Sequence, residues 1–288
     1  TTHDTKRSED TRARMLEIAE VPGEFDQLVE EVFALTPPPD TATGLFLLHN
    51  LLGAWPRDGR VTEDFTQRLQ AYAVKAVREA DMLSSWYDSD PAYEAQVTEW
   101  IAHLTHGPAT RMLADFALML HSGGVAVSLG RKLLQLVGPG IPDTYQGTEF
   151  FDFSLVDPDN RRFVDYAARS AAAGSPEDVA KQRVVREALA LRRERPQLFL
   201  DGGYAGVFAE GDASQHVVGM ARTGDGEAEV IALATREPLA LERDGGWRGT
   251  AVTLPDGIWT DSFSGRTYSG RVPMAELCAE LPVALLSR

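Results

Sequence analysis

From residue 24 to about residue 106, apolar residues recur at the three- and four-residue spacing of amphipathic helices. Polar turns separate these stretches, so we expect a series of helices rather than one long one. The apolar positions that define the predicted buried faces are Phe25, Leu28, Val29, Val32 and Phe33, then Phe65, Leu69, Tyr72 and Ala76, and finally Tyr93, Val97, Trp100 and Leu104.

Several residues mark where these helices begin and end. Asp90 followed by Pro91 supplies an N-cap with proline at the first helical position. The proline run 37–39 is a rigid connector between two helices. A further helix is predicted over residues 109–121, where Ser122-Gly123-Gly124 should stop it, and a short one over residues 129–137.

The last predicted helix begins at a capping-box pattern, Ser175-Pro176-Glu177-Asp178, and reaches about Arg195, where Pro196 ends it. Beyond residue 198 the pattern changes to short alternating runs separated by Gly, Asp and Pro, which is typical of an antiparallel sandwich. The predicted strands cover residues 204–209, 216–221, 229–234, 251–254, 258–261 and 282–286. We therefore place a domain boundary near residue 197.

Within the first part, between the helix predicted to end at residue 137 and the one predicted to begin near residue 175, lies a loop, residues 138–166, that no packing requirement explains. Its sequence, GPGIPDTYQGTEFFDFSLVDPDNRRFVDY, combines turn formers, carboxylates, aromatic residues and two adjacent arginines. Carboxylates accept hydrogen bonds while Asn and Arg side chains donate them, so the loop suits a neutral ligand covered in hydroxyl groups. We interpret it as a sugar-binding loop.

Composition narrows the class of protein. The 288 residues are 43% apolar and 25% charged, which is ordinary for a globular chain of about two domains. A net charge of -15 opposes phosphate backbones and anionic membrane surfaces, so nucleic acid and lipid are poor candidate partners. The single cysteine, Cys278, excludes an internal disulfide and agrees with a cytoplasmic location. The chain does not begin with methionine, so the natural start is expected elsewhere.

Three segments resemble a known family. Residues 140–149, GIPDTYQGTE, resemble the eighth-strand segment of alpha-amylase-type glycoside hydrolases, and residues 152–162, DFSLVDPDNRR, narrow the resemblance to the maltooligosyltrehalose synthases of that clan. The opening residues 1–10, TTHDTKRSED, are similar to the last catalytic motif of the same family. The resemblance covers essentially the whole chain but only the C-terminal portion of such an enzyme. Phe163 departs from the proline that usually follows the paired arginines.

The resemblance implies an α/β plus all-β fold. Residues 1–197 would be the C-terminal part of a (β/α)8 barrel, with strand seven ending at residues 1–4, strand eight at residues 141–146 and a helical insertion at about 11–121 between them. Residues 198–288 would be a small antiparallel β-sandwich domain. Because a parallel barrel is stable only when closed, we expect the chain to pair noncovalently with a complementary N-terminal portion of the same enzyme.

The implied activity is an intramolecular transglycosylation, with maltooligosaccharides as substrates and no cofactor or metal. By resemblance, Asp4 is the third carboxylate of the amylase-type site and favours the oxocarbenium-like transition state, while His3 donates to the same sugar ring. The nucleophile and the general acid lie on strands four and five in the family, so neither is in this sequence. The chain alone is therefore expected to be inactive.

The family moves the reducing-end glucose from an alpha-1,4 link to an alpha,alpha-1,1 link, so the freed glucose must be held while it turns. Our candidates for holding substrate share hydrogen-bonding side chains near the two motifs: Lys6, Arg7, Asp143, Tyr145, Gln146, Asp157, Asn160, Arg161 and Arg162. An alternative for Arg161 and Arg162 is surface pairing with Asp157 and Asp159. The assignment requires His3 and Asp4 to share one sugar pocket with Tyr145 and Arg161.

Other features leave alternatives open. Trp86 could stack on a sugar, since an aromatic face covers the apolar face of a pyranose, but a core position is an equal alternative. No carboxylate or cysteine lies at a typical metal-ligand spacing from the histidines, so we expect these to be core or surface residues. Two other functions remain open: a related amylase-clan hydrolase or glucanotransferase, which would release free sugar or exchange glucan chains, and a carbohydrate-binding module without activity.

Overall fold

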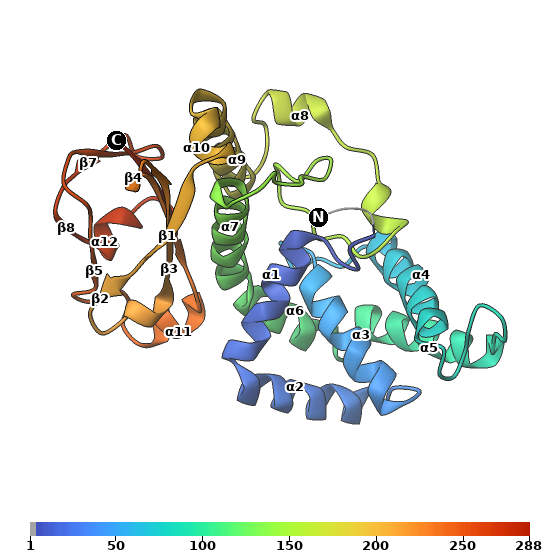
Figure 1. The fold of residues 1–288 in the computed structure, drawn as a ribbon. Coiled ribbons are helices and arrows are strands. Elements are labelled where there is room, and N and C mark those ends of the chain that lie inside the picture. The colour runs from blue at the N-terminus through green and yellow to red at the C-terminus, as the bar shows by residue number, and fades with distance from the viewer. Residues whose placement is uncertain (1–3) are drawn as a thin grey trace. The chain divides into compact units, whose positions relative to one another are not determined.

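The computed structural model describes residues 4–288 (Figure 1). These residues form two compact units, each made of two separate segments of the chain. The first unit comprises the described residues up to Gly124 together with Asp152–Phe163. The second comprises Val125–Phe151 and Val164–Arg288. The loop 138–166 is therefore shared between the two units, with residues 152–163 in the first and the rest in the second.

The first unit is helical, which confirms the prediction from apolar spacing. Phe25 and Leu28, Phe65 and Leu69, and Trp100 are all buried on their helices. The elements are α1 (Glu9–Glu17), the 3-10 turn η1 (Ile18–Glu20), α2 (Pro22–Leu35), α3 (Thr41–Ala54), α4 (Glu63–Ala80), α5 (Pro91–His106), α6 (Thr110–Met119), the first turn of α7 (His121–Val137) and the 3-10 turn η2 (Asp159–Arg161).

Side-chain caps start the three helices that surround the site. Asp40 accepts a hydrogen bond from the amide of Thr43 at the start of α3, and Thr62 does the same for α4. Asp90 caps α5 ahead of Pro91, as the sequence predicts. These caps satisfy amide groups that have no partner inside the helix.

Helix α7 corrects one prediction. Ser122, Gly123 and Gly124 do not stop a helix; they form the first turn of α7, which runs unbroken to Val137. The physical reason lies at Gly124, where an added Cβ would stand 3.0 Å from the Cα of Arg14 on α1. The glycine thus permits two helices to approach closely, and it does not serve as a terminator.

The strand predicted over residues 141–146 is not formed. Residues 141–145 have no regular secondary structure, and a turn follows them. All paired strands among the described residues are antiparallel and lie after residue 202, so a barrel strand at this position finds no parallel neighbour. Residues 1–3 of the predicted seventh strand lie outside the described residues.

Helices of the second unit lead into its sheets. Besides the rest of α7 they are α8 (Tyr166–Ser170), α9 (Pro176–Glu194) and α10 (Pro196–Leu200). The capping box predicted for α9 is confirmed: the Ser175 hydroxyl accepts from the Asp178 amide at 3.2 Å, and the Asp178 carboxylate accepts from the Ser175 amide at 3.1 Å. The helix ends before Pro196, also as predicted.

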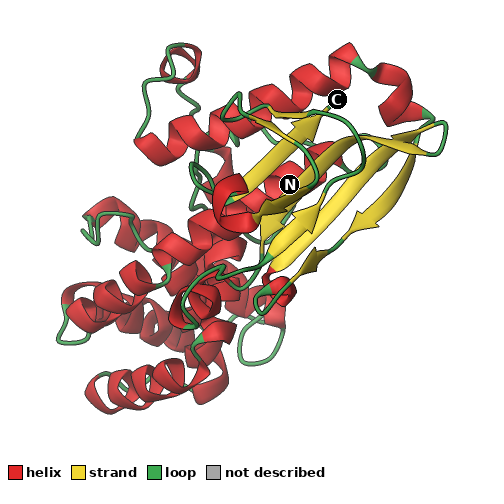
Figure 2. Ribbon diagram, turned by 90° about the vertical axis from the view of Figure 1, so that its left-hand side faces the viewer, coloured by secondary structure: helices red, strands yellow, loops and turns green. Residues whose placement is uncertain are grey.

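Two antiparallel sheets follow, and Figure 2 shows their strands in yellow. The larger has the order β1-β3-β4-β9-β6-β7 and the smaller β2-β5-β8. The strands are β1 (Gly203–Val207), β2 (Ala209–Glu210), β3 (Val217–Gly224), β4 (Glu227–Thr235), β5 (Ala251–Thr253), β6 (Trp259–Asp261), β7 (Thr267–Tyr268), β8 (Arg271–Pro273) and β9 (Val283–Ser287), with the turns η3 (Ser214–His216), α11 (Pro238–Arg243) and α12 (Met274–Leu277).

Each predicted strand has a counterpart in this region, although the run predicted over residues 204–209 is divided between β1 and β2, which belong to different sheets. The structure adds β7 and β8. These two are only two and three residues long, too short to show an alternating pattern. Ile231, Trp259 and Leu286 are fully buried in the core of the sheets. The sheets begin close to the boundary predicted at residue 197. Helix α9 belongs to the same unit as the sheets, and its Arg192 donates to the Leu136 carbonyl of α7 at 2.8 Å.

The chain is thus a mixed helical and sheet protein. Over residues 4–288 no individual helix has the length and hydrophobicity to cross a membrane, although α6 and α7, bent by 45°, reach that threshold as a pair.

Candidate functional site

One face of α4 carries polar residues that contact two of the segments with the family resemblance, residues 4–10 and residues 152–162. Arg68, Tyr72, Lys75 and Glu79 follow one another at intervals of four, three and four residues, so they form one stripe along the helix. Two of them face the N-terminal motif, and the other two face the turn that precedes Phe163. Helix α4 therefore holds the two segments in one place.

The two segments also pair directly with each other. Arg7 and Leu155 form an antiparallel bridge, and the Ser8 amide donates to the Ser154 carbonyl at 3.0 Å. The Asp152 amide donates to the Asp10 carboxylate at 2.8 Å. Residues 142 to 148 positions apart in sequence are thereby neighbours, as a common site requires.

Lys6 and Arg7 are held by different partners. The Lys6 ammonium lies 2.8 Å from a Glu79 carboxylate oxygen, and the Lys6 side chain remains 62% exposed. Arg7 is half-buried and donates to the Asn50 side-chain oxygen at 2.9 Å. Burial raises the pKa of Tyr72 to about 12, against the opposing charge of Arg7 beside it. Tyr72 is therefore neutral and a hydrogen-bond donor or acceptor at neutral pH.

The turn at residues 157–162 is fixed by the other half of the stripe. The Lys75 ammonium donates to the Asp157 carbonyl at 2.7 Å. Burial alone would raise the pKa of Asp159, but hydrogen bonds from Arg68 and its positive charge outweigh burial and lower it. Asp159 is thus a buried carboxylate that organises the turn, and it is unavailable as a general acid.

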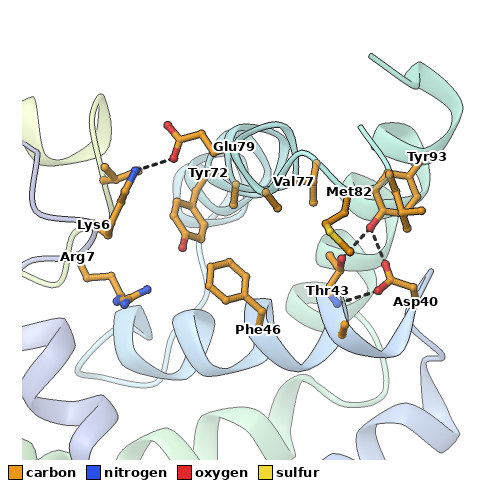
Figure 3. Close-up of a pocket in the computed structure, with 15 residues that line it drawn as sticks. Lys6, Arg7, Asp40, Thr43, Phe46, Tyr72, Val77, Glu79, Met82 and Tyr93 are labelled. Atoms are coloured by element: carbon orange, nitrogen blue, oxygen red, sulfur yellow. Dashed lines mark hydrogen bonds and ion pairs between the residues drawn. The ribbon is translucent and has the colours of Figure 1, made fainter. Parts of the chain in front are cut away.

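A cavity of about 650 Å³ opens beside these contacts within the first unit (Figure 3). Its volume falls in the range typical of small-molecule sites. Most of its wall is apolar and comes from α3, α4 and the turn after α4. The residues that line it are Lys6, Arg7, Asp40, Ala42, Thr43, Phe46, Tyr72, Ala76, Val77, Glu79, Ala80, Met82, Leu83, Tyr93 and Val156.

Polar groups gather at two ends of the cavity. Lys6, Arg7 and Glu79 stand at one end in Figure 3, and a cluster of Asp40 and Tyr93 stands at the other. The Tyr93 hydroxyl donates to Asp40 at 2.6 Å, and burial together with this carboxylate raises the pKa of Tyr93 to about 12. Apolar walls with hydrogen-bonding groups at both ends suit a neutral ligand that has apolar faces and hydroxyl edges.

The predicted site residues are not all placed together. His3 lies outside the described residues, and Asp4 stands exposed in a turn at the start of the described chain. Asp143, Tyr145 and Gln146 belong to the second unit, with Asp143 and Gln146 exposed and Tyr145 half-buried. A common pocket for His3, Asp4, Tyr145 and Arg161 therefore stays a prediction.

Arg161 and Arg162 form ion pairs with Asp157 and Asp159, which is the alternative to substrate binding that the sequence left open. Arg161 lies 2.5 Å from Asp157, and Arg162 lies 3.3 Å from Asp159 and 3.4 Å from Asp152. Their side chains remain 53% and 47% exposed. Asn160, which precedes them, is buried. Both arginines can turn toward a ligand only by giving up a carboxylate partner.

Comparison with known proteins agrees with the family resemblance. A curated Mycobacterium tuberculosis (strain H37Rv) protein named as a maltooligosyl trehalose synthase is 44% identical to this chain over 287 residues, which is all of this chain and 37% of that protein. The chain matches the C-terminal portion of a maltooligosyltrehalose synthase. No family model matches the sequence.

Solved synthase structures agree. The maltooligosyltrehalose synthase from Arthrobacter ramosus superposes with a TM-score of 0.90 at 41% identity, over all of this chain and 38% of that one. A second structure of a maltooligosyl trehalose synthase gives a TM-score of 0.81 at 26% identity, covering 39% of its chain. This chain therefore spans well under half the length of the synthases it matches.

Most of the residues that organise this part of the chain are not among the site residues predicted from the sequence. Arg68, Lys75 and Glu79 were passed over because the apolar face of α4 was the feature used to predict the helix. Their signal was nevertheless available, since they repeat at helical spacing beside that face. Among residues 4–288, no group of three or more His, Cys, Asp or Glu side chains is arranged to hold a metal ion.

Proposed function

We propose that this chain is the C-terminal portion of a (1→4)-alpha-D-glucan 1-alpha-D-glucosylmutase. The complete enzyme converts the reducing-end alpha-1,4 link of a maltooligosaccharide into an alpha,alpha-1,1 link, which gives a trehalosyl end. The observation that carries the proposal is the match along the whole chain to maltooligosyltrehalose synthases. The adjacency of residues 4–10 and residues 152–162, through Arg7 and Leu155, supports it.

The reaction is a retaining double displacement. Such enzymes place a nucleophilic carboxylate and a carboxylic acid about 5 to 5.5 Å apart. In our proposal both groups come from the N-terminal portion of the enzyme. Asp4 then acts as the third carboxylate, stabilising positive charge on the sugar ring, with His3 as a donor beside it.

The second displacement sets the distinctive demand on the site. The released glucose must turn and attack the glycosyl intermediate before water does. Water is roughly 55 M, whereas a well-held neighbouring nucleophile reaches an effective molarity of about 10⁵ M. How firmly the site holds the released glucose therefore decides whether it forms a trehalosyl end or water releases free sugar.

Lys6 and Arg7 are our leading candidates for holding it. Both line the cavity, both carry donors for hydroxyl groups, and both are fixed by partners on α3 and α4. The exposed position of Lys6 leaves its ammonium able to share its protons between Glu79 and a sugar. The turn with Asp157, Asn160, Arg161 and Arg162 is proposed as a second wall, since Leu155 just before it pairs with Arg7.

Product analysis tests the proposal. The chain is expressed with and without the N-terminal portion of the enzyme, and each sample is incubated with maltopentaose. A non-reducing product with a trehalosyl end, formed only by the combined portions, is the expected result. Free glucose or shortened maltooligosaccharides as the main product would favour a hydrolase or glucanotransferase. Maltooligosaccharide binding without turnover by the combined portions would favour a binding module.

A further inference from the structure

The connection between α4 and α5, in the first unit, has an exposed apolar surface that indicates a binding site. The connection between α4 and α5 presents four large apolar side chains to solvent: Met82 is 84% exposed, Leu83 54%, Trp86 58% and Tyr87 fully exposed at 102%. Contiguous exposed apolar groups of this size are uncommon on soluble proteins and mark binding sites. Single exposed residues would need no explanation, but four within six positions do.

The connection is held in a fixed shape. The Ser84 hydroxyl donates to Glu94 at 2.6 Å and accepts from the Asp90 amide at 3.1 Å. The Ser85 hydroxyl accepts from two amides of the same turn at 2.9 and 3.3 Å. Arg78 at the end of α4 binds Glu94 through two hydrogen bonds of 2.7 Å. Exposure of the aromatic rings is therefore part of an ordered surface.

Trp86 is arranged as a platform. The guanidinium carbon of Arg78 lies 5.1 Å from the centre of the indole ring, so the protein covers one face of the ring with a cation. More than half of the side chain remains exposed, which leaves the other face for a ligand. A flat ring backed by the protein on one side matches the apolar face of a glucopyranose ring.

This surface continues into the cavity. Met82 and Leu83 line the cavity whose other end holds Lys6 and Arg7, and Met82 stands beside Tyr93 in Figure 3. A ligand that extends from the cavity past Met82 therefore reaches the connection that carries Trp86. The net charge of -15 disfavours an anionic ligand. Lys6 and Arg7 in the cavity and Arg78 beside Trp86 disfavour a cationic one, which leaves a neutral ligand.

We propose that Trp86 and Tyr87 form an extension subsite for glucosyl units of a maltooligosaccharide that are remote from the reacting link. This inference rests on the proposed function and deepens it, because it names where the rest of the glucan chain binds. Each aromatic ring stacks on one sugar face, and the hydroxyl edges stay in solvent. Affinity should therefore rise with the length of the glucan.

The test uses the complete enzyme, consisting of this chain with its N-terminal portion, and a series from maltotriose to maltoheptaose. Trp86→Ala should lower kcat/KM for maltoheptaose by about three- to tenfold, and the loss should shrink as the substrate is shortened. Trp86→Phe should restore most of the activity, because it keeps an aromatic face. Phe208→Ala, which removes an 84% exposed aromatic residue of the other unit, is the matched control and should show no length dependence.

Tryptophan emission gives a readout that does not depend on turnover. Of the five tryptophans of this chain, Trp55, Trp100 and Trp259 are buried, Trp247 is half-buried and Trp86 is exposed. The difference in the maltoheptaose-induced emission change between wild type and Trp86→Phe isolates the contribution of Trp86, and we expect the variant to lose that contribution. If both wild type and Trp86→Ala form a trehalosyl product and their kcat/KM values depend on substrate length in the same way, the subsite is overturned and the proposed function still holds. An emission change without any trehalosyl product would support the subsite and remove the proposed function.

Discussion

Arg68 binds Asp159 with both prongs of its guanidinium group, with Nε 2.6 Å from Oδ1 and Nη2 2.9 Å from Oδ2. Both side chains are largely buried, and Asp159 also accepts the Leu155 amide at 2.7 Å. Two parallel charge-assisted hydrogen bonds fix direction as well as distance. This pair joins the middle of α4 to the turn that carries Arg161 and Arg162.

Removing Arg68 should destabilise the first unit strongly. Arg68→Ala leaves the Asp159 carboxylate buried without its main partner, and we expect a loss of about 3 kcal/mol in the free energy of unfolding. Arg68→Lys keeps the charge but loses the two-pronged geometry, so it should cost less than alanine. Urea unfolding followed by circular dichroism measures both.

The control for this prediction is Arg111→Ala. Arg111 pairs with Asp115 on an exposed helix face, with side chains 93% and 69% exposed, so its removal should cost less than about 1 kcal/mol. Equal losses for Arg68→Ala and Arg111→Ala would mean that the Arg68 pair does not hold the turn.

The sequence allows the helices and strands of this chain to be predicted because their signals are local. Apolar spacing identifies α2, α4 and α5, and Ser175 with Asp178 marks the start of α9. The pairing of Arg68 with Asp159 joins residues 91 positions apart, and nothing in the spacing of either residue specifies the other. The family resemblance led to the turn, but it did not identify the helix that supports it.

Gly124 shows how the same residue type can be misinterpreted. A glycine pair after a serine is a common helix end, yet here it forms the first turn of α7 against Arg14. The reason is a contact between helices, which sequence spacing does not contain. Helix existence was therefore predictable in this region, while the position of the helix start was not.

Replacing Gly124 by alanine should destabilise the protein, whereas the same replacement at a helical glycine with open space around it should stabilise the protein. Gly124→Ala places a Cβ 3.0 Å from the Arg14 Cα, and the Arg14 side chain is fixed by the Trp55 carbonyl, so α1 cannot easily shift. We expect a loss of about 1 to 3 kcal/mol. Gly23→Ala on α2 meets no atom within 4 Å and should stabilise by about 0.4 to 1 kcal/mol. Thermal unfolding of the two variants compares the signs, and stabilisation by Gly124→Ala would contradict the close approach.

Glu94 should make stability depend on pH. Hydrogen bonds from Arg78 and Ser84 lower its pKa from the ordinary 4.5 to about 2. Because the folded protein holds the charged form, this carboxylate contributes stability above about pH 4.5, and the contribution is lost as the pH falls toward 2. Glu94→Gln should therefore lower the free energy of unfolding by about 2 kcal/mol at neutral pH, with a shrinking difference from wild type at acid pH.

Urea unfolding at a series of pH values from neutral down to 3 measures this effect. Glu227→Gln is the control, because Glu227 pairs with Arg288 while 78% exposed and should show little change at any pH. A constant difference between wild type and Glu94→Gln over the whole series would show that hydrogen bonding alone, without the charge, accounts for the loss.

Arg7 and Arg161 should affect the products of the complete enzyme differently. Arg7 lines the cavity and is fixed by Asn50, whereas Arg161 is 53% exposed and already paired with Asp157 at 2.5 Å. If the cavity holds the released glucose, Arg7→Ala should weaken that hold and let water compete, so the share of free glucose should rise several-fold. Arg161→Ala should raise it less, because a ligand must first displace Asp157. The ratio of free glucose to trehalosyl product from maltopentaose measures both effects. Arg7→Lys, which keeps the positive charge, tests whether the hydrogen-bonding geometry of the arginine is needed. Thermal unfolding of each variant shows whether the fold is retained. A larger share of glucose from Arg161→Ala than from Arg7→Ala would move the holding site from the cavity to the turn.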